Sequence, residues 1–162
     1  MKYKSIKSIL LSNFDIRNNK MSKVRFIHHD RSAILKNRKQ LKLFIEHLFK
    51  QENKVLNGIT FIFCSDEYLL DINNQFLKHD FYTDVITFDL SSENRGGIQG
   101  EVYLSIDRIK DNAKELNILF IKELHRVVFH GALHLCGYKD KKKEEIAKMR
   151  FKEEEYLKMY FM

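Results

Sequence analysis

The sequence predicts an α+β protein in which a small β-sheet layer packs against about five helices. Two kinds of hydrophobic spacing lead to this class. Short alternating or continuous apolar runs, typical of strands, fall between residues 23 and 106. Apolar residues every three or four positions, typical of helices, occur within residues 37–76 and again within 107–160. At 162 residues, 44% of them hydrophobic, the chain can bury one core of the size of a single domain.

The first predicted elements alternate between strand and helix. Residues 23–28 alternate weakly as a strand, and residues 37–51 place their large apolar side chains on one helical face. Residues 59–64 form a β-rich apolar run directly after a glycine. Ser65, followed by two acidic residues, is typical of a helix start, so we expect a helix over residues 65–76.

The rest of the chain is predicted to complete the sheet with a hairpin and then to be helical. Residues 83–89 and 101–106 read as strands, and the glycine-containing loop at 91–97 is the natural hairpin connection between them. Three helical segments follow, at residues 107–117, 118–135 and 141–160.

Charge is distributed unevenly along the chain. Residues 1–50 carry 13 lysines and arginines against 3 aspartates and glutamates, whereas residues 51–162 carry 16 against 19. The net charge of +7 therefore comes from the first third. Such an arm is typical of proteins that bind polyanions, because each neutralised phosphate releases counterions. A tail that only increases solubility has the same composition, so both interpretations stay open.

Residues 1–22 are predicted to be a basic extension, disordered or non-native, that precedes a single domain over residues 23–162. The extension has little periodicity, and Met21 reads as an alternative start. Its apolar run over residues 9–11 is too short for a signal-peptide core or a membrane span.

The two cysteines, Cys64 and Cys136, lie far apart in the sequence and have no CxxC spacing. They suggest neither a disulfide framework nor a four-cysteine zinc site, and a reducing compartment fits best. We therefore expect a cytoplasmic protein without a membrane partner, and we expect Cys136 to be a core residue.

The segment HGALHLCGYKD, residues 130–140, concentrates the side chains that can bind a metal. His130 and His134 are four residues apart, so on a helix they project from the same face and can share one ion. Gly137 can adopt the left-handed conformation that ends a helix, which allows the chain to turn back and bring Asp140 to the same ion. Three protein ligands leave the open position that catalytic zinc sites keep for water. We therefore predict one zinc ion per chain, held by His130, His134 and Asp140.

Two histidines at helical spacing are by themselves more often ordinary helix residues, and the third ligand and the glycine favour the metal site. The same spacing occurs in zinc metallopeptidases of the HExxHxxGxxH/D type, where a glutamate after the first histidine acts as general base. Here Gly131 occupies that position, and the next glutamate along the chain is Glu144. Without that proton acceptor, a metallopeptidase-like hydrolase is only the alternative prediction.

At these residues the sequence resembles the YbeY family of bacterial metal-dependent endoribonucleases. The family signature, His-Gly-x-Leu-His-Leu-x-Gly-Tyr-Asp-His, is matched in register by His130, Gly131, Leu133, His134, Leu135, Gly137 and Tyr138. A second segment, Leu-Asn-x2-Tyr-Arg-x2-Asp-x-Pro-Thr-Asp-Val-Leu-Ser-Phe, is matched at Asn73, Asp80, Thr83, Asp84, Val85 and Phe88. A third, Gly-Asp-Ile, is approximated by Gly100, Glu101 and Val102. The resemblance covers about residues 23–160.

The resemblance implies a zincin-like metal helix near the C-terminus and a single-strand-specific, metal-dependent endoribonuclease. It further implies a role in maturation of small-subunit (16S) ribosomal RNA and in ribosome quality control, with ribosomal RNA and the small ribosomal subunit as partners. The expected chemistry is hydrolysis, in which the metal polarises a scissile phosphate and activates a water molecule. Thr83, Asp84 and Thr87 are expected to shape the floor of the cleft, and Asp84 could instead support the site through a hydrogen bond.

Two departures from the family pattern affect the predicted site. The third family histidine is Asp140 here, and its negative charge broadens the choice of metal toward harder ions such as manganese. The family's Tyr-Arg pair is Phe76-Leu77, so the arginine expected to contact RNA phosphate is missing. We expect Lys78 or Arg126 to bind RNA in its place. A non-catalytic ribosome-assembly factor with a structural metal therefore also stays open as an alternative.

Overall fold

The computed structural model describes residues 22–33, 35–78, 80–92 and 96–162. These residues contain a four-stranded sheet in the order β1-β2-β4-β3. The strands are β1 (Val24–His28), β2 (Leu56–Cys64), β3 (Val85–Asp89) and β4 (Ile98–Ser105). Strands β1, β2 and β4 are parallel, and β3 pairs with β4 in the antiparallel direction, which confirms the predicted hairpin.

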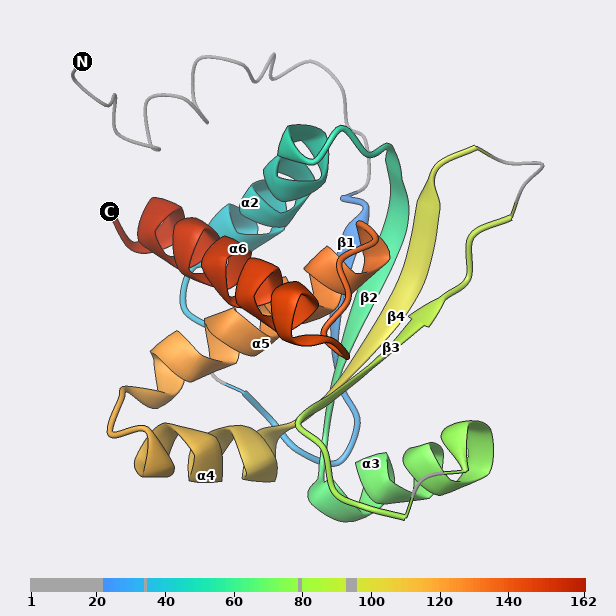
Figure 1. Cartoon of the computed structure of the whole chain (residues 1–162), viewed down its shortest axis with the longest axis vertical. Coiled ribbons are helices and arrows are strands. Elements are labelled where there is room, and N and C mark those ends of the chain that lie inside the picture. Colours follow the sequence, from blue (N-terminus) through green and yellow to red (C-terminus); the bar gives the residue numbers. More distant parts are fainter. Residues whose placement is uncertain (1–21, 34, 79, 93–95) are drawn as a thin grey trace.

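Five α-helices accompany the sheet in the described part of the chain, which confirms the predicted α+β class. They are α2 (Arg38–Gln51), α3 (Asp66–Ile72), α4 (Ile106–Glu115), α5 (Phe120–Leu135) and α6 (Lys143–Phe161), and α3 continues into a π-helical turn, η1 (Asn73–Leu77). Figure 1 shows α2, α5 and α6 gathered on one side of the sheet, with α3 apart from them near its end. None of the described helices is long and apolar enough to cross a membrane.

The alternation along the strands separates two apolar clusters on the two faces of the sheet. Phe61 and Phe63 of β2, with Val102 and Leu104 of β4, are fully buried in the main core with α2, α5 and α6. The smaller cluster joins α3 to the other face and contains Cys64, Leu69, Ile72 and Ile86. The continuous apolar run in β2 follows from this arrangement, because a strand covered on both faces has no solvent side.

Some predicted boundaries were wrong by a few residues. Strand β2 begins at Leu56 rather than after Gly58, because a register irregularity between these two residues accommodates the glycine within the strand. Ile106, predicted to end a strand, begins α4, because Ser105 caps that helix by accepting a hydrogen bond from the Arg108 backbone N–H at 3.0 Å.

Two close contacts set α5 directly on the sheet. A Cβ atom at Gly131 would lie 2.4 Å from Cγ1 of Val102, and one at Gly100 would lie 2.7 Å from Cδ1 of Leu135. The helix backbone and the strand backbone can approach each other this closely only because both positions are glycines. The C-terminal half of α5, which carries both histidines of the motif, is therefore fixed against β3 and β4.

The predicted N-terminal extension, residues 1–22, lies outside the described residues apart from Ser22. The boundary of the single domain at residue 23 stays a prediction.

Candidate metal centre

Helix α5 presents the two histidines of the motif on one face, as the spacing predicted. The side chain of His130 is 14% exposed and that of His134 is 25% exposed, so both imidazoles lie partly buried at the edge of the core. Their Nε2 atoms are 2.9 Å apart. Burial and the neighbouring His130 ring lower the pKa of His134, which favours the neutral imidazole that can bind a metal.

The turn after α5 brings Asp140 back to the histidines. Gly137 has a φ of 101°, its N–H donates to the carbonyl of His134, and the N–H of Tyr138 donates to the carbonyl of Leu133. This pair of bonds is a Schellman motif, which requires the left-handed residue that only glycine adopts easily. The predicted role of Gly137 is confirmed.

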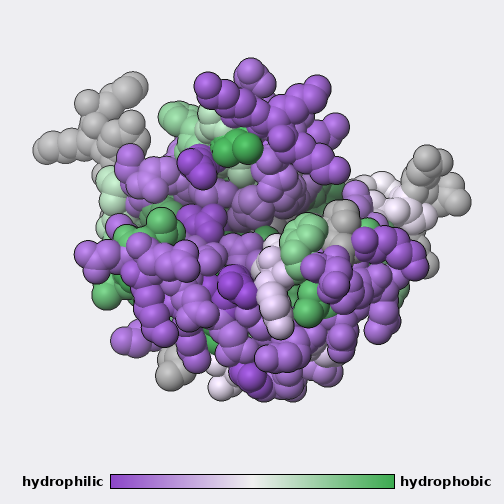
Figure 2. All heavy atoms as spheres, turned by 60° about the horizontal axis from the view of Figure 1, so that its bottom comes forward, coloured by the Kyte–Doolittle hydropathy of each residue, from purple (hydrophilic) through white to green (hydrophobic). Residues whose placement is uncertain are grey.

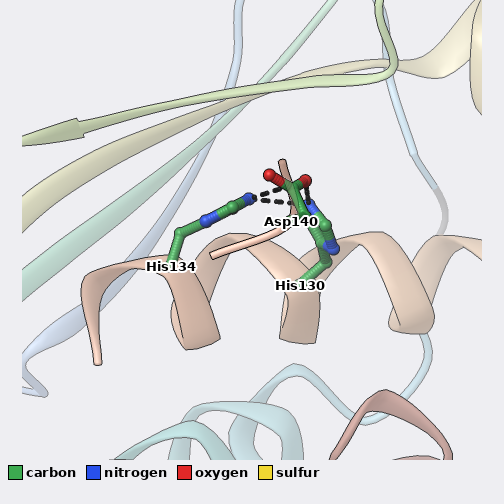
Figure 3. Close-up of side chains that lie close together, drawn as sticks. All are labelled: His130, His134 and Asp140. Carbon is green, nitrogen blue, oxygen red and sulfur yellow. Dashed lines mark hydrogen bonds and ion pairs between the residues drawn. The ribbon is translucent and has the colours of Figure 1, made fainter. Parts of the chain in front are cut away.

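The three ligand atoms converge on one point. Oδ2 of Asp140 lies 3.5 Å from Nε2 of His130 and 3.4 Å from Nε2 of His134 (Figure 3). A tetrahedral ion with bonds of about 2.0–2.2 Å holds its ligand atoms about 3.3–3.6 Å apart. The two separations to Asp140 fall within this range, and the two Nε2 atoms, at 2.9 Å, lie somewhat closer together than a bound ion would hold them. The three atoms are near enough to share a single ion, and the donor set of two imidazoles and one carboxylate is one that zinc accepts.

The Nδ1 atom of each imidazole has a hydrogen-bond partner on the side away from Asp140. Nδ1 of His130 lies 2.6 Å from Oε1 of Glu153 on α6, and Nδ1 of His134 lies 3.0 Å from the carbonyl oxygen of Tyr138. An acceptor at Nδ1 fixes the ring orientation and keeps the lone pair on Nε2, which is the usual support of a metal-binding histidine. Both rings are therefore oriented for binding through Nε2.

Glu153 is a member of the site that the sequence interpretation missed. It is 5% exposed, although it belongs to a highly charged helix. Burial alone would raise the pKa of Glu153, but the hydrogen bond and charge of His130, together with Arg126, hold that pKa below its usual value. A signal was present, because Glu153 follows Met149 by four residues and precedes Tyr156 by three, on the apolar face of the helix.

Comparison with known proteins identifies the family. A family model described as "Endoribonuclease YbeY" matches residues 19–160. The chain is 46% identical over 134 residues to a protein named Endoribonuclease YbeY from Cytophaga hutchinsonii, covering 83% of this chain and 93% of that protein. It is 40% identical over 139 residues to one of the same name from Porphyromonas gingivalis, covering 86% and 91%. The chain belongs to the YbeY family.

The YbeY resemblance inferred from the sequence is thus confirmed, and a solved structure supports the fold. The solution structure of TM1509 from Thermotoga maritima is 31% identical, with a TM-score of 0.58, and the match covers 85% of this chain and 89% of that one.

At the position after the first histidine, this chain has Gly131 where the metallopeptidases have a glutamate. The packing of α5 on the sheet gives a physical reason for the difference. The helix lies so close to β4 that a Cβ at this position would overlap Val102, whose side chain is fully buried. A glutamate has no space here. The glutamate that accepts the proton in the peptidase mechanism is therefore absent from this position, and the packing leaves no space for its side chain.

Arg126, one of the two predicted RNA-binding residues, lies in a network of carboxylates. Its guanidinium donates to Glu123 at 2.6 and 2.8 Å, to Glu153 at 3.2 Å and to Asp84 at 3.4 Å. Burial alone would lower the pKa of Arg126. The three carboxylates raise that pKa by a larger amount, so the guanidinium stays charged. This geometry favours a role in holding Glu153 behind His130, and RNA binding by Arg126 stays a prediction.

Lys78 ends η1 in the left-handed conformation, with φ at 59°, and is exposed. It is the neighbour in sequence of Leu77, which lines the cleft together with His134, but RNA binding by Lys78 also stays a prediction. Cys136 is 7% exposed within the main core, as expected.

The cleft has a volume of about 390 Å³ and opens next to His134. Thr83 and Thr87 line it as predicted, together with Leu77, Phe81 and Lys141. Asp84 does not line the cleft: it contacts Arg126, which contacts Glu153, which in turn contacts His130. Support of the site by Asp84 stays a prediction.

Tyr138 is held in turn by a second polar cluster. Its hydroxyl donates to Glu52 at 2.8 Å, and Glu52 also accepts from Tyr156 at 2.5 Å and lies 3.2 Å from Nζ of Lys152. Burial and the hydrogen bond to Glu52 raise the pKa of Tyr138 to about 12, so its hydroxyl stays a donor. The turn whose Tyr138 carbonyl contacts His134 is thereby anchored to Glu52, directly after α2.

Proposed function

We propose that this protein is a metal-dependent endoribonuclease that hydrolyses single-stranded RNA, with one zinc ion held by His130, His134 and Asp140. The observation that carries the proposal is the convergence of two Nε2 atoms and one carboxylate oxygen at separations of 2.9, 3.4 and 3.5 Å. Membership of the YbeY endoribonuclease family supports RNA as the substrate.

Zinc is the proposed metal because two oriented imidazoles and one carboxylate form a donor set that it prefers. When bound, the ion supplies Lewis-acid polarisation of a phosphate oxygen and activation of water. Glu153 and the Tyr138 carbonyl keep both imidazoles aimed at it. Lys141 lines the cleft next to this group and would stabilise the extra negative charge on the phosphate in the transition state.

We further propose that the substrate is small-subunit ribosomal RNA and that the protein acts in ribosome maturation and quality control in the cytoplasm. The family resemblance supports this role. The excess of basic residues in the first 50 positions is suited to a polyanionic partner such as a ribosomal particle.

Removal of the metal with a chelator is expected to reduce cleavage of a single-stranded ribosomal RNA fragment to the protein-free rate, and stoichiometric zinc is expected to restore it. Gel analysis of end-labelled RNA measures this directly. Cleavage that persists in metal-free protein would contradict the proposal. A metal-loaded protein that binds small-subunit particles without cutting RNA would favour the assembly-factor alternative.

Glu153→Gln is expected to weaken zinc binding by about 10- to 100-fold, because the substitution replaces the charged acceptor behind His130 with a neutral amide. Competition against a chromophoric chelator measures the affinity. Glu154→Gln is the matched control, since Glu154 is the exposed neighbour on the same helix. Equal zinc affinity in both variants would remove Glu153 from the metal centre.

A further inference from the structure

Four exposed apolar side chains lie close together in the sequence around the connection between η1 and β3. Phe76 is 66% exposed, Leu77 43%, Phe81 57% and Tyr82 50%. We call these four residues the apolar wall. Single exposed apolar residues are common on protein surfaces, but a group of them beside a functional cleft marks a binding surface.

The apolar wall borders the cleft of the metal centre. Leu77 and Phe81 line that cleft together with His134 and Lys141. Figure 2, in which the α3 and α4 end of the molecule comes forward, shows small hydrophobic areas set in a mostly hydrophilic surface. The lining of the cleft therefore combines apolar side chains with a cation and one histidine of the metal-binding group.

Neighbouring side chains hold the apolar wall in position. The amide of Asn73, which is 2% exposed, donates to the carbonyl of Phe81 at 2.8 Å. The ring of Phe76 packs edge-on against Phe88, with the centroids 5.6 Å apart. The guanidinium of Arg108 lies 5.0 Å from the centroid of the Tyr82 ring.

Arg108 is itself fixed by Asp66 at 2.8 Å, so the guanidinium and the Tyr82 ring form one stacked unit. The surface presented to a ligand is thus largely preformed, which lowers the entropic cost of binding.

We propose that the apolar wall is a nucleobase-binding subsite, on which unpaired bases of single-stranded RNA stack while the adjoining phosphate lies at the metal centre. This inference rests on the proposed function, because it takes RNA as the polymer in the cleft. A nucleotide combines an aromatic base, whose faces stack on apolar surfaces, with an anionic phosphate, and the lining of the cleft offers a partner for each of these two parts.

The subsite gives a physical reason for single-strand preference. Bases in a duplex stack on one another and offer no free face, whereas unpaired bases can stack on aromatic side chains regardless of their identity. The chain carries Leu77 where the family pattern has an arginine, so an apolar contact takes the place of a phosphate contact at this point of the cleft. The expected result is preference for unpaired RNA with little sequence discrimination.

The test is the affinity of the zinc-loaded full chain for a labelled single strand of about a dozen nucleotides and for the same strand in a duplex. Fluorescence anisotropy is read immediately after rapid mixing, before cleavage. Phe81→Ala is expected to weaken single-strand binding by about 5- to 160-fold, the range that corresponds to the loss of one base–aromatic stack, and to leave duplex binding unchanged. Phe81→Trp should restore the affinity. Phe151→Ala, which removes a 69% exposed phenylalanine on α6, is the matched control and should behave as wild type.

The outcomes separate this inference from the proposed function. Single-strand affinity that is unchanged in Phe81→Ala would overturn the subsite, even if wild type cleaves RNA. Equal loss of single-strand and duplex affinity would also overturn it, because stacking on unpaired bases cannot explain a duplex effect. Loss of single-strand affinity alone supports the subsite, whether or not the same samples show cleavage.

Discussion

His134→Ala is expected to abolish stoichiometric metal binding and RNA cleavage together. The substitution removes one of three converging ligand atoms, so the loss of zinc affinity should exceed the roughly 10- to 100-fold cost of losing a supporting hydrogen bond. The fold should survive, because the lost bond from His134 to the Tyr138 carbonyl costs only about 1 kcal/mol of stability. Metal content per chain, measured by atomic absorption beside an RNA cleavage assay, tests both parts.

The matched control is His47→Ala. His47 is a partly buried histidine on α2, away from the metal-binding group, so this variant should keep about one metal per chain. Full metal content in His134→Ala would refute the assignment of the ligands. Loss of metal with undiminished cleavage would leave the metal site in place but remove it from the reaction.

Gly131→Glu, which restores the metallopeptidase pattern, is expected to destabilise the protein strongly and to create no peptidase activity. A Cβ alone would come 2.4 Å from Val102, and overpacking of this kind costs about 1–3 kcal/mol. The glutamate would add a buried carboxylate, whose desolvation raises the cost further. The displaced helix would also move His130, so metal binding should weaken with stability.

A double-mutant cycle isolates the steric cause. Gly131→Ala and Val102→Ala should each lower the free energy of unfolding in urea, and the double variant should be less destabilised than the sum of the two. Gly58→Ala is the control for adding a methyl group at a glycine, because its nearest atom would be 3.9 Å away. A fully additive cycle would mean that Val102 is not what excludes a side chain at position 131.

Much of the fold was predictable because the local signals agree with the tertiary structure. The apolar face of α2, the alternation in β4 and the glycines around the β3–β4 loop each gave the correct element. The boundaries were less accurate where a side chain decides them, as at Ser105, whose hydroxyl caps a helix that the apolar pattern alone would start later.

The proposed ligand set could be read from the sequence because all three residues fall within one helix and the turn that follows it. The contact between Glu153 and His130 could not be predicted in this way. It depends on how α6 packs across α5, and residue spacing within one helix does not reveal that arrangement. Arg126 illustrates the same limit. An arginine one helical turn before His130 suggests phosphate binding. In the structure, however, its guanidinium contacts three carboxylates, which belong to Asp84 just before β3, Glu123 on α5 and Glu153 on α6.

The anchoring of Tyr138 by Glu52 bears on the order in which the protein becomes active during synthesis. The metal-binding group lies late in the chain, and its supports come from residue 52 at the end of α2 and residue 153 on the last helix. A nascent chain that still lacks α6 has both histidines but no Glu153 to orient His130. In such a chain His130 lacks its orienting carboxylate, so the metal-binding group would reach its full affinity only once α6 has packed against α5.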